Sequence, residues 1–382
     1  MPMLALEGIK VLDFCRNAPG MFATMILADL GAEVLMVERP MDETRAAYER
    51  IVAGIETPED ERRHASFSAL QRNKRSIALN LKEPEALEVF RRLAADADVV
   101  VEGFRPGVVD RLGVGYEQMA GHDINYISFA GALGLIGDSP DGKPVIPLNL
   151  VADYAGGGLC GAVGILAALM AREKTGRGQY VDIAMTEGVL YMLCGLIADA
   201  LSQGYRATRG GNRLNGGSPF YNVYRTSDGK YFSIAAIEPW FWENLCRAIG
   251  REDLIPHQSA GEEKRAEIAS TLEAIFLTRT REEWFEALRD ANISVGKVYD
   301  LEEALTDPQA LARGMVVELE TPGVPEGKVT QPGIPFHLSD TPGEVRHPGG
   351  VTGQHTAEVL ASLGYTSIQI DGLLARGVAA GG

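Results

Sequence analysis

Short apolar runs alternate with longer helical patterns at the start of the chain. Residues 9–14 and 33–38 are apolar runs of strand length, and residues 21–30 between them form an apolar helical stretch that stops at Gly31. A strand, a helix and a second strand in this order predict a parallel, right-handed β-α-β unit. Residues 98–102 add another buried strand pattern. The pattern predicts an α/β fold with a large, doubly wound, Rossmann-like domain.

The same alternation continues further along the chain. Residues 77–81 have a strand pattern, and a helix is expected to begin at Glu83-Pro84. The run 159–170 is apolar and rich in small residues, which predicts a buried helix. Residues 180–184 form another strand pattern, followed by a long apolar helical pattern at 187–201. We expect these elements to belong to the large domain.

A second domain is expected after residues 203–219, which are rich in Gly, Asn and Arg and are typical of a linker. Two strand patterns flank Asp228-Gly229, a combination that predicts a β-hairpin. Helical patterns follow at 239–249, 262–276 and 281–290. The expected division is a large domain at 1–202, a linker at 203–219, a smaller α+β domain at 220–318, and a return segment at 319–382.

Composition and charge exclude several classes of protein. The 382 residues are 46% hydrophobic and carry a net charge of −16, which opposes binding to nucleic acid or to an anionic membrane. No uninterrupted apolar run of spanning length and no export signal is evident, so we expect a cytoplasmic protein. The cysteines form no CxxC pair, and the six histidines show no metal-ligand spacing. We therefore expect reduced thiols and no metal.

Two residues are candidates for chemistry. His122 stands in AGHDINY, and Asp153 stands in NLVADYAGGG, directly ahead of the run at 159–170. Asp153 is thus expected at or just before a helix N-terminus, where unpaired N–H groups and the helix dipole favour a carboxylate. An aspartate in this place is usually only an N-cap, and a single histidine is usually structural. Neither residue indicates catalysis when taken alone.

Longer motifs place both residues in a known context. These are AGHDINYIS (120–128), PLNLVADYAGGG (147–158), GQYVDIAM (178–185), EGIKVLD (7–13), ADLGAEVLMVERP (28–40), NKRS (73–76), GFRPGV (103–108), GSPFY (217–221) and IEPWF (237–241). Together they resemble the α-methylacyl-CoA racemases, a branch of the family III CoA-transferase superfamily. The resemblance runs nearly end to end, and the His122 motif points to the racemase branch.

The resemblance implies an enzyme of lipid metabolism that inverts the α-carbon of 2-methylacyl-CoA thioesters. Inversion removes a proton from one face and delivers one to the other, so two bases must flank a planar enolate. His122 suits one side because imidazole ordinarily titrates near neutral pH, and Asp153 suits the other if an apolar pocket keeps it protonated for part of the cycle. By resemblance, Glu238 orients His122. The N–H groups of 156–158 are expected to bind the enolate oxygen.

Coenzyme A, as part of the substrate, is the only cofactor expected. Residues 41–66 are charged and predict a surface excursion, and a basic cluster follows at 71–75. The resemblance places this cluster and Arg39 along the groove for the nucleotide and phosphates, a task that suits the planar fork of arginine. The cofactor-binding residues expected from it are Arg39, Arg72, Asn73, Lys74, Arg75, Arg105, Asp123 and Tyr126. It also implies a homodimer of interlocked subunits.

One segment departs from the family. Only 17 positions separate Arg105 from His122, where relatives carry the end of a helix, a strand and a glycine-rich loop that contacts CoA. Two alternatives therefore stand beside the racemase. One is a CoA-transferase in which Asp153 is a nucleophile that forms an acyl-aspartyl anhydride. The other is a non-catalytic acyl-CoA-binding relic. His122 discriminates between the enzymes, because the transferase has no use for a histidine opposite the aspartate.

Overall fold

The computed structural model describes residues 3–42, 55–103, 121–321 and 324–381. The chain forms two compact units whose positions relative to one another are not determined. The first unit contains 1–126, 149–189 and 307–382, and the second contains 127–148 and 190–306. The sequence pattern predicted domain boundaries at 202 and 318, whereas the boundaries between the units lie at 189 and 307. In addition, residues 127–148 belong to the second unit.

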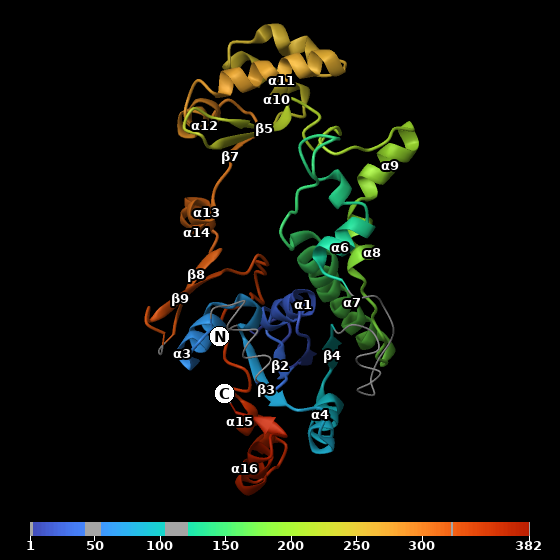
Figure 1. The fold of residues 1–382 in the computed structure, drawn as a ribbon, viewed down its shortest axis with the longest axis vertical. Helices are drawn as coiled ribbons and strands as arrows, with labels where there is room; N and C mark the ends of the chain where they lie inside the picture. The colour runs from blue at the N-terminus through green and yellow to red at the C-terminus, as the bar shows by residue number, and fades with distance from the viewer. Residues whose placement is uncertain (1–2, 43–54, 104–120, 322–323, 382) are drawn as a thin grey trace. The chain divides into compact units, whose positions relative to one another are not determined.

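A five-stranded sheet in the order β10-β3-β2-β1-β4 forms the centre of the first unit (Figure 1). Its strands are β1 (Lys10–Phe14), β2 (Glu33–Glu38), β3 (Lys74–Leu79), β4 (Val99–Glu102) and β10 (Ala379–Ala380). Strands β1, β2, β3 and β4 run parallel to one another, and β10 pairs antiparallel with β3. The predicted parallel β-α-β unit is therefore confirmed.

Helices cover both faces of this sheet. On one face, α1 (Ala18–Asp29) and α7 (Cys160–Thr175) pack through Leu27 and Ile165 against Val11 and Val34. On the other face lie α4 (Pro84–Asp96), α15 (Thr356–Ser362) and α16 (Ser367–Ala375), whose core includes Val89, Leu360 and Leu373. The C-terminal helices thus complete the core of the N-terminal sheet (Figure 1). This is a mixed α/β unit with a parallel-rich sheet.

The strand predicted at 180–184 is wrong. These residues form no strand, and Tyr180 and Ile183 are 71% and 39% exposed. A strand depends on a neighbour for its ladder of hydrogen bonds, and among the described residues the sheet ends at β4. Val100, in the middle of β4, is itself 49% exposed. An apolar pattern without an adjacent strand to pair with therefore forms no strand here.

Three helical predictions also needed correction. The charged excursion at 41–66 includes α3 (Pro58–Phe67), which begins with a capping box between Thr57 and Asp60. The helix expected at 187–201 is α8 (Met185–Met192) and α9 (Cys194–Gln203), with a bend of 55° at the break. The helix predicted at 159–170 is α7 (Cys160–Thr175), and the helical run that contains it starts earlier because the π-helix η3 (Leu150–Leu159) runs directly into α7.

One continuous helical run is longer and more apolar than the sequence analysis allowed. By length and composition alone, Leu150–Thr175 could cross a membrane, and so could the bent pair of α8 and α9. The expectation that no run reaches spanning length was therefore wrong. Within the fold, Ala162 and Ile165 of the longer run are buried against α1 and the sheet, whereas Val163 and Met170 are exposed, so α7 is buried on one side only.

The second unit is built around a β-hairpin. β5 (Tyr221–Arg225) and β6 (Tyr231–Ala235) pair antiparallel as predicted, and β7 (Val295–Lys297) adds a third strand. Helices α10 (Pro239–Ala248), α11 (Glu262–Phe276) and α12 (Arg281–Leu288) supply the core, in which the Phe276 ring stacks on those of Tyr224 and Phe232. These helices lie close to their predicted bounds because each has a regular apolar stripe.

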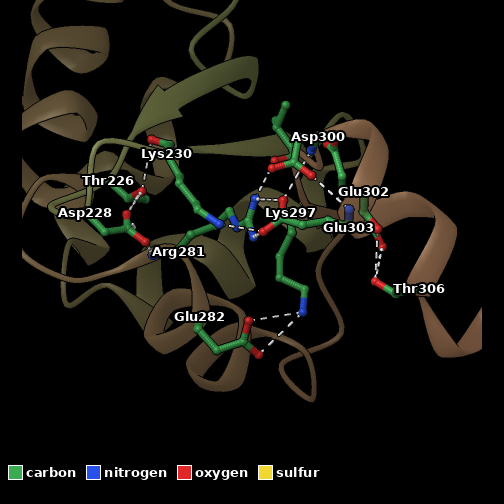
Figure 2. A network of polar contacts seen from close by, with 11 residues as sticks. Thr226, Asp228, Lys230, Arg281, Glu282, Lys297, Asp300, Glu302, Glu303 and Thr306 are labelled. Atoms are coloured by element: carbon green, nitrogen blue, oxygen red, sulfur yellow. Dashed lines mark hydrogen bonds and ion pairs between the residues drawn. The ribbon is translucent and has the colours of Figure 1, made fainter.

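A buried arginine ties three parts of this unit together (Figure 2). The guanidinium of Arg281 donates to both carboxylate oxygens of Glu303 and to the carbonyl of Val298. Lys230, at the hairpin turn, pairs with the same carboxylate. These bonds lower the pKa of Glu303 and join α12, the hairpin and α13 (Leu301–Thr306).

The remaining elements are short. In the first unit, α14 (Pro308–Ala312) precedes the antiparallel pair β8 (Val316–Glu320) and β9 (Lys328–Pro332). Helix α6 (Asp123–Phe129) begins in the first unit and continues into the second. The short helices are η1 (Ala69–Gln71), η2 (Leu133–Leu135) and η4 (Glu252–His257).

Candidate active site

His122 and Asp153 line the same cavity of about 670 Å³ in the first unit. Its walls come from β4, from the start of α1, from Ile165 and Leu169 of α7, and from the segment 178–186. Tyr126 lines the cavity as well. A volume of several hundred Å³ is typical of small-molecule sites, about 300–1,000 Å³. The structure thus brings together the histidine and the aspartate that the sequence singled out.

The backbone around His122 fixes this residue at the beginning of α6. The His122 N–H donates to Asn125 Oδ1 at 3.1 Å, and its carbonyl accepts the N–H groups of Asn125 and Tyr126 at 2.9 and 3.2 Å. The preceding residue, Gly121, packs closely against the Tyr126 ring, since a Cβ there would lie 2.9 Å from Cζ of Tyr126. The motif GHDINY therefore builds one compact turn that leaves the His122 side chain exposed to the cavity.

Asp153 lies in the first turn of the helical run that begins at Leu150. Its side chain is partly buried, and Oδ2 accepts a hydrogen bond of 3.1 Å from Nδ2 of Asn149. Burial raises the pKa of Asp153, the Asn149 bond opposes this rise, the charge of Asp123 adds to it, and His122 lowers it. The net effect is a raised pKa. A carboxyl group with a raised pKa can hold a proton during part of a catalytic cycle.

The glycines after Asp153 allow close packing and do not open a helix. Added Cβ atoms would lie 2.8 Å from the Met185 carbonyl oxygen at Gly156, 2.8 Å from Pro19 at Gly157, and 2.7 Å from Phe22 at Gly158. All three residues lie inside the π-helix, where backbone N–H groups serve helical hydrogen bonds. The expectation that their N–H groups bind an enolate oxygen is therefore wrong for this conformation.

Asp123 has a different environment from the one expected of a CoA-binding residue. It is 5% exposed, and Oδ2 accepts the backbone N–H groups of Ala152 and Asp153 at 2.7 and 2.8 Å. Its carboxylate thus faces the protein and holds the turn that carries Asp153. Tyr126, from the same motif, lines the cavity.

Arg72 and Asn73 are buried in the protein. The Arg72 side chain is 1% exposed, and its Nε and Nη2 bind the two oxygens of Asp29 at 3.0 and 2.6 Å. Its Nη1 donates to the carbonyl of Pro332. Asn73 donates to Asp29 at 2.9 Å and to the Glu344 carbonyl at 2.8 Å. These contacts join α1 to the C-terminal segment, and they occupy the groups that were expected to bind phosphate.

Lys74 is fully buried as well. Its Nζ donates to Asp13 Oδ2 at 3.1 Å, to Thr24 Oγ1 at 2.7 Å and to the Met21 carbonyl at 3.0 Å. Three protein acceptors leave this ammonium no free donor. The burial and pairing of Arg72 and Lys74 argue against the phosphate contacts that the sequence analysis expected of them.

Arg75 and Arg39 remain candidates for phosphate. The Arg75 side chain is 46% exposed and pairs with Glu358 at 2.8 Å, a surface ion pair that a phosphate can replace. Arg39 is also 46% exposed, and it pairs with Asp42. Arg105 lies outside the described residues. Glu238 is the N-cap residue of α10 in the second unit, whereas His122 lies in the first. Among the described residues, no cluster of His, Cys, Asp and Glu could hold a metal ion.

Comparison with known proteins identifies the family. Residues 6–120 and 117–356 match CoA-transferase family III. The chain is 34% identical to human alpha-methylacyl-CoA racemase over 96% of this chain and 95% of that protein. It is 30% identical to human succinyl-CoA:glutarate CoA-transferase over 98% of this chain and 89% of that protein. The crystal structure of a CAIB/BAIF family protein from Brucella suis superimposes with a TM-score of 0.77 at 26% identity, covering 95% of this chain and 100% of that one.

The comparisons also bear on the short segment before His122. The alignment with the human racemase has 394 positions but uses only 96% of this 382-residue chain, so about 27 positions have no counterpart here. The two parts of the family match meet at residues 117–120, just before the His122 motif. With a family match over most of its length and full-length relatives of 30–34% identity, the chain belongs to CoA-transferase family III.

Proposed function

We propose that this protein is an α-methylacyl-CoA racemase that inverts the α-carbon of 2-methylacyl-CoA thioesters. The observation that carries the proposal is the presence of His122 and Asp153 in one cavity, with the pKa of Asp153 raised by burial. Two residues that can each exchange a proton, placed around one carbon, are what a 1,1-proton transfer needs. The identity to the human racemase supports this choice.

The proposed reaction conserves protons at each step. With one enantiomer, neutral His122 removes the α-proton, and the C–H electron pair moves into the thioester to form an enolate. Protonated Asp153 then donates its proton to the opposite face, which leaves an imidazolium and a carboxylate. With the other enantiomer the two residues exchange roles. Burial that raises the pKa of Asp153 helps it to act as an acid near neutral pH.

The remaining parts of the site follow from the family and from the exposed basic residues. We propose that Arg39, Arg75 and Arg105 bind the CoA phosphates and that Tyr126 contacts the ligand in the cavity. We also propose, from the family resemblance, that Glu238 orients His122. No cofactor besides the CoA moiety of the substrate is needed for this chemistry.

We propose a homodimer of interlocked subunits in the cytoplasm. Large apolar side chains lie exposed on α8 and α9, among them Tyr191 at 80% and Leu201 at 79%. An exposed apolar strip of this kind is typical of a surface that another chain covers. The family resemblance supplies the interlocked arrangement.

A CoA-transferase is the second candidate. Asp153 would attack an acyl-CoA carbonyl to form an anhydride and expel CoA thiolate. The thiolate would then attack the aspartyl carbonyl of the anhydride, which releases the donor acid as a carboxylate and leaves an aspartyl-CoA thioester. The 30% identity to human succinyl-CoA:glutarate CoA-transferase favours this reading. It needs a carboxylate in the cavity and makes no use of His122.

Enantiomer-resolved deuterium incorporation tests the proposal. Each enantiomer of a 2-methylacyl-CoA is incubated in D₂O with the wild type, His122→Ala or Asp153→Asn, and inversion and exchange are measured separately. We expect both variants to lose inversion by about 10²–10⁴-fold, since each removes a general acid–base group. Each variant should keep exchange mainly with the enantiomer that faces its remaining base.

Two results would reject the racemase. If His122→Ala inverts at the wild-type rate while Asp153→Asn is inactive, the aspartyl nucleophile of a transferase replaces the two-base mechanism. If the wild type binds the thioester by calorimetry but neither exchanges deuterium nor transfers CoA, the protein is a binding relic.

A further inference from the structure

Asp123 joins the two proposed bases through the backbone. It follows His122 in the sequence and is the first residue of α6. Its carboxylate oxygen Oδ2 accepts the N–H groups of Ala152 and Asp153, which stand 29 and 30 residues further along the chain. One side chain therefore fixes the turn that carries Asp153 to the turn that carries His122.

The contact is built for a carboxylate. The first N–H groups of a helical run have no partner within the helix, and an anionic acceptor satisfies them better than a neutral one. Asp123 is 5% exposed, so water competes little for these two bonds. Hydrogen bonds that involve a charged group are stronger than those between neutral groups. The link is therefore strong enough to set the place of Asp153.

We propose that Asp123 is a positioning residue whose carboxylate sets the place of Asp153 relative to His122. Its negative charge also acts on the Asp153 carboxyl group. This inference rests on the proposed racemisation. It replaces the role of CoA contact that the sequence suggested for Asp123.

The electrostatic part has a defined sign. The groups that act on Asp153 are Asn149 on its own helix and Asp123 and His122 from the α6 turn. Arg16, Glu102 and Asp182 also line the cavity and are present in every variant considered. Burial is the main cause of the raised pKa of Asp153, and the negative charge of Asp123 raises it further. Removal of that charge must therefore lower the pKa of Asp153.

Two variants separate position from charge. Asp123→Asn keeps an oxygen that can accept the two N–H groups but removes the charge, whereas Asp123→Ala removes both. The matched control is Asp307→Asn, because Asp307 also accepts two backbone N–H groups, those of Gln309 and Ala310 at 2.9 and 3.1 Å, at the start of α14. Asp307 does not line the cavity.

The first measurement is deuterium exchange with each enantiomer of a 2-methylacyl-CoA. Asp123→Ala is expected to slow exchange with the enantiomer that faces Asp153 by about 10²-fold, the effect of a displacement near 1 Å. Exchange with the enantiomer that faces His122 should fall much less. Asp307→Asn should leave the ratio of the two rates unchanged. Equal losses with both enantiomers in Asp123→Ala would overturn the positioning role.

The second measurement needs no activity. A water-soluble carbodiimide modifies protonated carboxyl groups, so the pH dependence of Asp153 labelling, read by mass spectrometry, reports its protonation. In Asp123→Asn the midpoint should move to lower pH, and in Asp307→Asn it should not move. An unchanged midpoint in Asp123→Asn would overturn the electrostatic role. If the midpoint shifts but the wild type inverts no substrate, the link between Asp123 and Asp153 stands and the racemase proposal fails.

Discussion

Replacement of Arg72 tests whether the basic cluster at 71–75 supports the fold or binds CoA. The side chains of Arg72 and Asp29 are 1% and 3% exposed, and two hydrogen bonds join them. Arg72→Met keeps most of the side-chain volume but leaves Asp29 buried opposite an apolar group. Breaking a buried ion pair on one side costs about 3–5 kcal/mol. At about 2–4 °C per kcal/mol, the melting temperature of the first unit should fall by about 6–20 °C.

The assay pairs urea unfolding with calorimetric titration of an acyl-CoA. Arg72→Met should lower the free energy of unfolding, while the folded variant binds the thioester as the wild type does. Arg75→Met is the matched control, since its ion pair with Glu358 is exposed at 46% and 67% and contributes about 0–1 kcal/mol. Wild-type stability together with tenfold weaker binding in Arg72→Met would refute the structural role.

The pH dependence of this loss has a defined sign. Burial raises the pKa of Asp29, and the bonds from Arg72 and Asn73 oppose that rise. Arg72→Met removes the hydrogen bonds and the positive charge of Arg72, so the folded-state pKa of Asp29 rises further above its unfolded value. A carboxyl group with a raised folded-state pKa binds protons better when folded, so stability is regained as pH falls through that pKa. The destabilisation should be largest near neutral pH and shrink on acidification. A loss that is constant between pH 7 and 5 would contradict this account.

Two further predictions concern CoA binding. Arg75→Ala should weaken acyl-CoA binding more at low than at high salt, because phosphate contacts are screened by ions; equal weakening at both salt concentrations, measured by calorimetry, would exclude a phosphate role. Insertion before Ala120 of the strand and glycine-rich loop that the sequence analysis expects in relatives should tighten acyl-CoA binding relative to a scrambled insert of equal length, and a folded insertion variant without that gain would show that the chain compensates elsewhere.

The sequence predicted the elements whose signals are local. The parallel β1-α1-β2 unit and the β5-β6 hairpin follow from apolar periodicity and from the Asp228-Gly229 turn. The motif that carries His122 and the motif that carries Asp153 were both found, and the structure places them in one cavity. Such patterns can be predicted because the residues that determine them are neighbours in the chain.

The functions of the basic residues could not be predicted in this way. Arg72 and Lys74 stand in a basic segment that is typical of an exposed phosphate-binding site. Their ion-pair partners, Asp29 and Asp13, lie 43 and 61 residues earlier in the chain. Only the fold shows that both cations are buried and paired. The role of Asp123 was missed for the same reason, because its carboxylate is used by backbone N–H groups 29 and 30 residues away.

Three features of the first unit are related: the residues 180–184 form no strand, β4 is exposed at the edge of the sheet, and a cavity lies beside both. Among the described residues, β4 is the last strand of the sheet, and Val99–Gly103 and Gly178–Thr186 both line the cavity that holds His122 and Asp153. A strand between them would pair with both and fill part of that space, since neighbouring strands lie about 4.8 Å apart. The family match is divided at 117–120, just before the His122 motif, where the sequence analysis expects relatives to carry a further strand. Within the part of the chain that the structure describes, β4 and the segment 178–186 form part of the wall of the cavity that holds both proposed bases.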